Sequence, residues 1–184
     1  MKYLSASMVH SAATITLLSV TQYNTFAFGK KLFQAVCGIV LLMIGISFPA
    51  TNTLAITCLF CGCWTLISLD MPAKYRANRI VKAMNGNFPI NTYRFYSNHF
   101  ILTSNQISEE IPYSSLIRLI ENKKYLFLYI SPFSAYMVDP KTISSSSGAL
   151  KKLLEDSTGL KWESPNRLLT FSRKSVFRYK NHKA

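Results

Sequence analysis

Four cysteines come nearest, by type and spacing, to forming a chemical site in this chain. Cys58 and Cys61 form a Cys-x-x-Cys pair, with Cys63 two residues later and Cys37 upstream. Such a pair could bind zinc or exchange disulfides, but zinc needs further ligands and redox cysteines need access to solvent. All four lie in apolar segments, where cysteine also serves as a small apolar residue. We therefore expect no metal, cofactor or redox centre.

The other potential acids, bases and nucleophiles do not form a catalytic constellation in the sequence. His10, His99 and His182 are scattered, and none has a Cys, Asp or Glu at ligand spacing. Glu109 and Glu110 are adjacent, so on a strand their side chains would point to opposite faces. The sequence has no phosphate-binding glycine loop, HExxH motif or GxSxG elbow. We therefore expect a protein that is not an enzyme.

A run of four serines, Ser144 to Ser147, has a nucleophilic and a structural interpretation. A nucleophilic serine needs an activating base, and the sequence places none beside the run. We expect these hydroxyls to serve a loop and to cap a helix from Ala149 to Asp156, with phosphorylation as the alternative. An enzymatic hypothesis would depend on this run and on Cys58 and Cys61, so alanine substitutions there should leave any phenotype intact.

An uncharged run from Leu32 to Leu69 dominates the first half of the chain. It has thirty-eight consecutive residues without Asp, Glu, Lys, Arg or His, and Pro49 is its only proline. Its two parts, residues 32–49 and 53–69, are each about as long as a helix that crosses a bilayer. A buried helix pair in a soluble protein is the alternative, but such helices normally show a polar face. We expect two transmembrane spans.

The break between the spans predicts a tight helical hairpin. Pro49 cannot continue the first helix without losing a backbone hydrogen bond, and Thr51 and Asn52 suit the turn and the N-cap of the second. Lys30 and Lys31 precede the first span, basic residues follow the second, and the turn has no charge. By the positive-inside rule, this pattern predicts a multi-pass membrane protein with both termini in the cytoplasm.

Small residues recur seven positions apart in both spans. They are Gly38 and Gly45 in the first span, and Ala55 and Gly62 in the second, with Cys58 between the latter two. Seven residues make two helical turns, so these positions can form facing stripes where two backbones approach closely. Packing within one hairpin is the simpler interpretation, and self-association into a homo-oligomer through the same stripes is the alternative.

Positive charge is concentrated after the second span. The net charge is +13, yet residues 1–69 hold three lysines and no acid, whereas residues 70–184 hold eighteen basic and eight acidic side chains. We expect a basic juxtamembrane helix at residues 71–86. Its cations are Lys74, Arg76, Arg79 and Lys82. They could bind anionic lipid headgroups or simply fix the membrane topology, and the sequence leaves both interpretations open.

Residues 87–160 change from a helical to an alternating pattern, which is typical of short strands joined by tight turns. The expected strands centre on Tyr93–Phe95, Phe100–Leu102, Ile107–Ile111, Leu116–Glu121, Tyr125–Ile130 and Ala135–Val138. Leu150, Leu153 and Leu154 then mark an amphipathic helix. The pattern predicts a small antiparallel β domain that ends in a helix.

The two ends of the chain are less regular. In residues 1–29, the β-branched segment Ser11–Val20 predicts a strand, followed by a helix that leads into the first span; a signal peptide is the alternative. Residues 161–184 form a basic tail with seven basic residues and one acid. We expect it to lie on anionic lipid, with Arg173 and Lys174 as headgroup contacts. A mobile solvated tail is an alternative, and nucleic acid is not expected because no recognised module is present.

Three segments of the second half combine apolar and turn residues in a recognisable order. They are YRFYSNHFILTS (Tyr93–Ser104), IPYSSLIRLIENKKYLFLYI (Ile111–Ile130) and AYMVDPKTI (Ala135–Ile143). Together with the preceding hairpin, across roughly residues 30–156, they resemble the YcxB-like family of bacterial membrane proteins. The resemblance implies a cytoplasmic sheet domain of pleckstrin-homology-like shape, carried by two transmembrane helices, without an assigned activity. Asp139 departs from the family pattern, where an aliphatic residue is more common.

The expected fold class is therefore an α+β membrane protein, with a transmembrane helical hairpin and a pleckstrin-like β domain. The leading functional hypothesis is an inner-membrane protein that presents this domain for binding a protein partner or a lipid headgroup. The alternative is a small immunity or accessory protein that acts on a toxin or a membrane complex through its hairpin.

Overall fold

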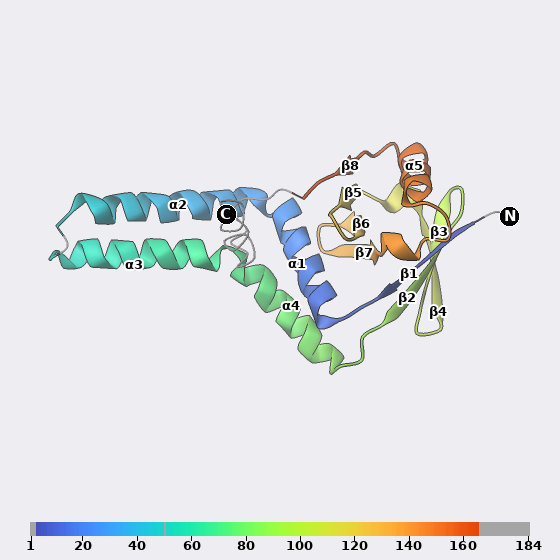
Figure 1. Ribbon diagram of the computed structural model, residues 1–184, viewed down its shortest axis with the longest axis horizontal. Coiled ribbons are helices and arrows are strands. Elements are labelled where there is room, and N and C mark those ends of the chain that lie inside the picture. The colour runs from blue at the N-terminus through green and yellow to red at the C-terminus, as the bar shows by residue number, and fades with distance from the viewer. Residues whose placement is uncertain (1–2, 50, 166–184) are drawn as a thin grey trace, which may run out of the picture.

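The computed structural model describes residues 3–49 and 51–165, in which a helical rod projects from a β domain (Figure 1). The helices are α1 (Ala12–Phe26), α2 (Phe28–Ser47), α3 (Thr53–Ile67), α4 (Met71–Met84) and α5 (Ser147–Thr158). The strands are β1 (Leu4–Val9), β2 (Ile90–Phe95), β3 (His99–Ser104), β4 (Ile107–Pro112), β5 (Arg118–Glu121), β6 (Leu126–Ser131), β7 (Ser134–Val138) and β8 (Trp162–Glu163). Three 3₁₀ turns are η1 (Ser68–Asp70), η2 (Tyr113–Ser115) and η3 (Pro140–Thr142).

The rod is a hairpin of α2 and α3, and its turn confirms the prediction from Pro49 and Asn52. Helix α2 ends at Ser47, ahead of the proline. Asn52 is the N-cap of α3, and its side-chain oxygen accepts a hydrogen bond of 2.9 Å from the Leu54 amide. However, α2 begins at Phe28 rather than Leu32, so the two lysines expected before the span lie inside the helix.

Both arms of the rod are long and apolar enough to cross a membrane. These are α2 and the continuous helical stretch Thr53–Met84, which comprises α3, η1 and α4. Large apolar side chains point outward along the rod. Phe33, Ile46, Phe60 and Ile67, for example, are between 70% and 77% exposed. A soluble helix pair would instead bury such side chains, because each one exposed to water costs about 1.5–3 kcal/mol.

The β domain contains two four-stranded sheets. The first has the order β1-β2-β3-β4 and is antiparallel throughout. The second has the order β7-β6-β5-β8, in which β8 runs parallel to β5. Apart from β8, the described strands therefore pair antiparallel, as predicted. Strand β8 also occupies the start of the expected tail, and two residues are too few to show an alternating pattern.

The N-terminal strand is displaced from its expected position. Ser11–Val20 was expected as a strand but begins α1, because Ser11 and Thr14 form a reciprocal capping box that starts a helix. The strand is instead Leu4–Val9, which pairs with β2 across six residues. Ala6 and Met8 of this strand are buried in the core of the domain.

The core lies between the two sheets and α5. Strand β6 is buried from Leu126 to Tyr129, as its nearly all-apolar sequence predicts. Aromatic side chains of the first sheet, including Phe95 and Phe100 with ring centroids 5.5 Å apart, pack toward it. Leu150 and Leu154 of α5 have no exposed surface. In Figure 1 this helix lies at the top of the domain, on the side away from the rod.

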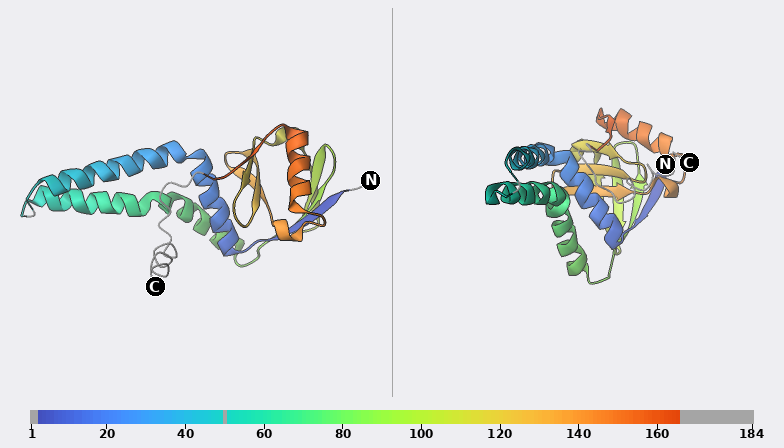
Figure 2. Two further views of the ribbon diagram at one scale, coloured as in Figure 1. Left: turned by 45° about the horizontal axis from the view of Figure 1, so that its top comes forward. Right: turned by 60° about the vertical axis from the view of Figure 1, so that its left-hand side comes forward.

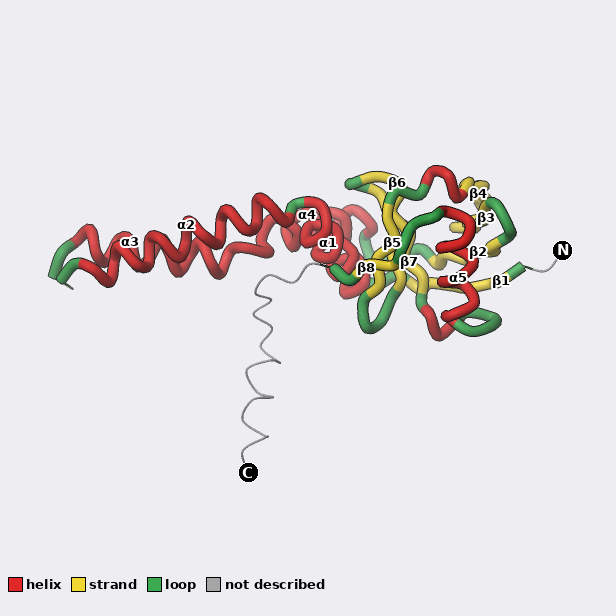
Figure 3. The backbone as a smooth tube through the Cα atoms, turned by 90° about the horizontal axis from the view of Figure 1, so that it is seen from above, coloured by secondary structure: helices red, strands yellow, loops and turns green. Residues whose placement is uncertain are grey.

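Helices α1 and α4 join the rod to the domain. The chain leaves the first sheet from β1 through α1 into α2, and returns from α3 through α4 into β2 (Figure 2). Helices α1 and α4 pack against each other, and Phe26 of α1 contacts Tyr129 of the second sheet with a ring separation of 5.1 Å. Viewed from above, the domain and both connecting helices lie at one end of the rod (Figure 3).

Candidate functional site

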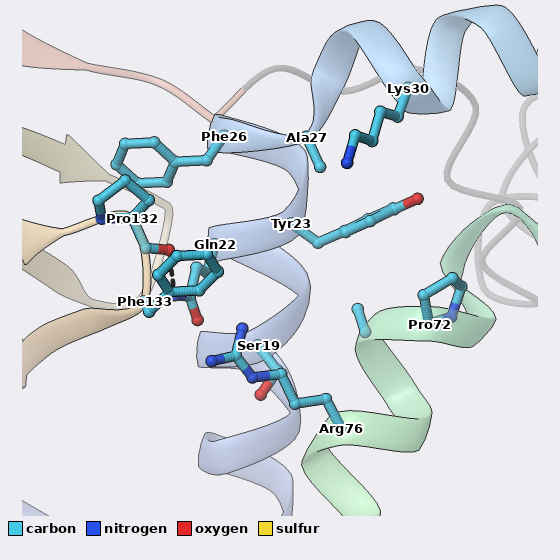
Figure 4. A pocket seen from close by; sticks show the side chains of 11 residues that line it. Ser19, Gln22, Tyr23, Phe26, Ala27, Lys30, Pro72, Arg76, Pro132 and Phe133 are labelled. Atoms are coloured by element: carbon cyan, nitrogen blue, oxygen red, sulfur yellow. Dashed lines mark hydrogen bonds between the residues drawn. The ribbon is translucent and has the colours of Figure 1, made fainter.

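A cavity of about 310 Å³ lies where the rod meets the domain. We call it the junction pocket. Its walls come from α1, the start of α2, α4 and the turn between β6 and β7 (Figure 4). It is lined by Ser19, Gln22, Tyr23, Phe26, Ala27, Lys30, Pro72, Ala73, Arg76, Pro132 and Phe133. These residues come from three separate segments of the sequence, 19–30, 72–76 and 132–133, so the pocket exists only in the folded chain.

Two cations reach the junction pocket from different helices. Lys30 extends from α2 toward the ring of Tyr23, and Arg76 extends from α4 toward Ser19 on α1 (Figure 4). The Arg76 guanidinium carbon lies 5.3 Å from the centroid of the Phe133 ring. Within residues 3–49 and 51–165, neither cation forms an ion pair. Their positive charges are therefore not neutralised by any carboxylate in this part of the chain.

Neutral polar groups complete the wall on the α1 side. The Gln22 side-chain amide donates a hydrogen bond to the carbonyl oxygen of Pro132, which fixes the β6–β7 turn against α1. Burial and the nearby Asp70 carboxylate raise the pKa of Tyr23, so its hydroxyl stays protonated and can donate a hydrogen bond. The junction pocket thus combines two cations with a hydroxyl donor.

A second cavity of about 250 Å³ adjoins the junction pocket. The two cavities share Ser19, Gln22, Arg76 and Phe133. The other residues of the second cavity are mostly apolar: Ile15, Leu18, Ile80, Met84, Pro89, Ala135, Ser134 and His10. Arg76 and Phe133 therefore lie between a cationic hollow and a mainly apolar one.

The basic residues predicted to bind lipid divide into three groups. Arg76 lines the junction pocket, whereas Lys74, Arg79 and Lys82 are exposed on α4 and do not line it. Arg173 and Lys174 lie outside the described residues. From the sequence, Lys30 was expected only to set the membrane topology, because it is far from α4 along the chain. In the fold, Lys30 and Arg76 of α4 line the same pocket.

A buried ion pair fixes the base of the hairpin. Lys31 has no exposed surface, and its Nζ lies 2.6 Å from Asp70 Oδ1 and 2.8 Å from Asn24 Oδ1. One turn further along α2, the Gln34 amide donates to the Thr65 carbonyl at 3.2 Å and to the Ser68 hydroxyl at 3.1 Å. These contacts join α1, α2 and η1, and no sequence pattern indicates the pairing of Lys31 with Asp70 across 39 positions.

The small residues of the spans meet inside the hairpin. A methyl group added at Gly62 would lie 2.9 Å from the Gly38 carbonyl oxygen, and one added at Gly45 would lie 3.0 Å from the Ala55 carbonyl oxygen. Each position therefore faces the opposite backbone at a distance that excludes a larger side chain. Cys58, between Ala55 and Gly62 in the sequence, is half-buried.

The residues considered for chemistry lie apart from the junction pocket, except for one histidine in the adjoining cavity. Cys61 and Cys63 are exposed on the rod, and no group of three potential metal ligands occurs in the described part of the chain. His10 lines the second cavity. Within the serine run, Ser146 has a structural role. Its hydroxyl oxygen caps α5 by accepting a hydrogen bond of 3.1 Å from the Ala149 amide.

Comparison with protein families gives one match. Residues 95–155, a third of the chain, match the model of the YcxB-like protein family, so this segment is a YcxB-like domain. The match runs from the end of β2 into α5 and does not include the hairpin, which the resemblance in sequence had extended to residue 30. No curated protein and no solved structure matches the chain.

Proposed function

We propose that the chain is an integral membrane protein whose α2–α3 hairpin holds a YcxB-like domain against the cytoplasmic face of the membrane. There the domain binds a lipid headgroup or a protein partner. The observation that carries this proposal is the outward-facing apolar surface of the rod, which no other part of the described chain covers. A bilayer is the solvent that such a surface requires.

The contact geometry supports an insertion in which both ends of the hairpin lie on one side. The β1–α1 and α4–β2 connections leave the same end of the rod, and the turn at its other end carries no charge. Lys30 and the cations of α4 are at the domain end. By the positive-inside rule, this charge distribution supports a cytoplasmic position for the domain.

The domain architecture supports a pleckstrin-like module. Two packed sheets close around one core, and the C-terminal helix α5 covers it with Leu150 and Leu154. Domains of this general construction present loops and edges for binding, and the fold alone does not assign a reaction. We accordingly propose a binding role rather than an enzymatic one.

The alternative of a toxin-directed accessory protein was motivated by the small-residue stripes. Those stripes are in contact with each other inside the hairpin. They are therefore used for internal packing, and a partner helix would have to bind the larger outward-facing side chains instead. For this reason we favour the role of a membrane-held binding module.

The orientation can be tested by labelling single cysteines with a membrane-impermeant maleimide in intact cells. In a background where the four native cysteines are replaced, Thr51→Cys reports the hairpin turn and Lys82→Cys reports α4. We expect labelling of the turn variant in intact cells and of the α4 variant only after the membrane is opened. Equal labelling of both variants in intact cells would refute the proposed topology.

A further inference from the structure

We propose that the junction pocket binds the phosphate group of an anionic membrane phospholipid. This inference rests on the proposed function, because it requires the rod to be inserted in a bilayer. It goes further by naming the ligand and the site, since basic residues spread over a helix surface attract any anionic membrane, whereas a pocket selects one chemical group.

The charge of the pocket matches this ligand. Lys30 and Arg76 approach from opposite helices, and of the described residues that line the cavity none is acidic. A guanidinium and an ammonium are the side chains that best bind phosphate oxygens, because charge-assisted hydrogen bonds are about twice as strong as neutral ones. The protonated Tyr23 hydroxyl, which extends toward the gap between α2 and α4, is a further hydrogen-bond donor.

The depth of the pocket matches the headgroup layer. Lys30 lies two positions before the uncharged run begins at Leu32, which is about 3 Å along a helix axis. Pro72 of the opposite wall is the second residue of α4, three positions after the uncharged run ends at Leu69. The polar layer on each side of a bilayer is about 5–7 Å thick, so a phosphate bound between these residues stays attached to acyl chains in the bilayer.

The Lys31–Asp70 ion pair at the base of the hairpin keeps this site preformed and positive. Lys31 neutralises Asp70 at this end of the rod. The same ammonium group donates a hydrogen bond to Asn24 of α1. Without that pairing, the Asp70 carboxylate would be free to compete for Lys30 or Arg76. The arrangement therefore separates one lysine with a structural role from its neighbour, which is available to a ligand.

The test compares two double variants with the same loss of charge. Lys30→Gln with Arg76→Gln removes the pocket cations, whereas Arg79→Gln with Lys82→Gln removes two exposed cations of α4 that do not line the pocket. Full-length proteins are reconstituted in nanodiscs of phosphatidylglycerol and phosphatidylcholine in equal amounts. Native mass spectrometry then measures how much of each lipid is retained.

We expect the native protein to retain phosphatidylglycerol preferentially. In the pocket variant this preference should fall by about tenfold, because charge-assisted hydrogen bonds to the phosphate are lost. In the α4 variant the preference should fall by less than about twofold. Arg76→Lys, which keeps the charge, should retain most of the preference and so excludes misfolding as the cause. Equal losses in both double variants, or no preference in the native protein, would overturn the proposal.

Two further measurements separate the sources of failure. Inorganic phosphate is added to the same nanodiscs: if it displaces the retained lipid at low concentration, the pocket binds a soluble anion and the lipid assignment is wrong. Integration of each protein is measured independently by its resistance to alkaline extraction. A protein that integrates without preferring phosphatidylglycerol refutes the pocket assignment alone, whereas failure to integrate refutes the proposed function.

Discussion

At the scale of single residues, the base of the hairpin depends on a lysine that is completely buried. The sequence suggests that Lys31 is an exposed lysine that sets the membrane topology. In the structure its side chain instead contacts Asp70 and Asn24. No pattern in one sequence reveals such a contact, because it depends on how α1 crosses the hairpin. Lys30, its neighbour, is exposed and faces the junction pocket instead.

Removal of one partner of this ion pair should destabilise the protein strongly. We expect Lys31→Met or Asp70→Leu alone to cost about 3–5 kcal/mol, because the remaining charged group stays buried without its partner. The double variant Lys31→Met with Asp70→Leu should recover much of that loss. Thermal unfolding of the full chain in detergent, followed by circular dichroism, measures the cycle. Additive losses in the double variant would contradict the coupling.

The contact at Gly62 predicts a steric cost for even one added methyl group. A Cβ there would lie 2.8 Å from Leu42 Cγ and 2.9 Å from the Gly38 carbonyl oxygen. We expect Gly62→Ala to lower the unfolding free energy by about 1–3 kcal/mol. Gly29→Ala is the matched control, since no described atom lies within 4 Å of that position. A loss of equal size at both glycines would show that the two helices do not pack as described.

His10 predicts a dependence of stability on pH. Burial lowers the pKa of His10 below its ordinary value of 6.5. Its Nε2 lies 3.1 Å from the Asn91 amide. The unfolded chain therefore binds the proton more tightly than the folded chain, so the unfolding free energy decreases as the pH falls below 6.5 and levels off below the folded-state pKa. Urea unfolding at about one pH unit above and one pH unit below 6.5 should show this decrease in unfolding free energy. The variant His10→Gln should show a smaller decrease. An unchanged pH dependence in the variant would contradict this assignment.

At the scale of elements, the sequence predicted those parts that local patterns define. The uncharged run and Pro49 located the hairpin, and alternation located the strands from β2 to β7. It misplaced β1 because β-branched residues in Ser11–Val20 suggested a strand, whereas the capping box of Ser11 and Thr14 starts a helix there. Strand β8 is too short to give a periodic signal.

The candidate site was only partly predictable for a related reason. Arg76 was identified from charge on a helix next to the membrane, but the other walls of the junction pocket are remote in sequence. Tyr23 and Phe133 are unremarkable residues of their own segments. They become part of a site only because α1 packs between α4 and the β6–β7 turn (Figure 4).

Strand β1 predicts that the folded domain extends beyond the matched family segment. Met8 is 2% exposed in the core, whereas its neighbour Val9 is 64% exposed. We expect Met8→Ala to destabilise the domain by about 2–5 kcal/mol, and Val9→Ala to change its stability by less than about 0.5 kcal/mol. Tryptophan fluorescence from Trp162 during urea unfolding measures both. Equal effects would show that β1 does not pack as the first strand of the sheet.

At the scale of the whole molecule, the rod and the β domain suit two different environments. The β domain buries its apolar side chains around a core of its own, while the rod directs them outward. The helices α1 and α4 and the ion pair at the base connect the two parts. A ligand at the junction pocket would therefore contact the rod and the domain together.

The most direct measurement is extraction of the full-length protein from cell membranes with alkaline carbonate, which removes peripheral proteins and leaves integral ones in the pellet. The account predicts that the protein stays in the pellet and is released only by detergent. Release into the supernatant without detergent would contradict insertion of the α2–α3 hairpin.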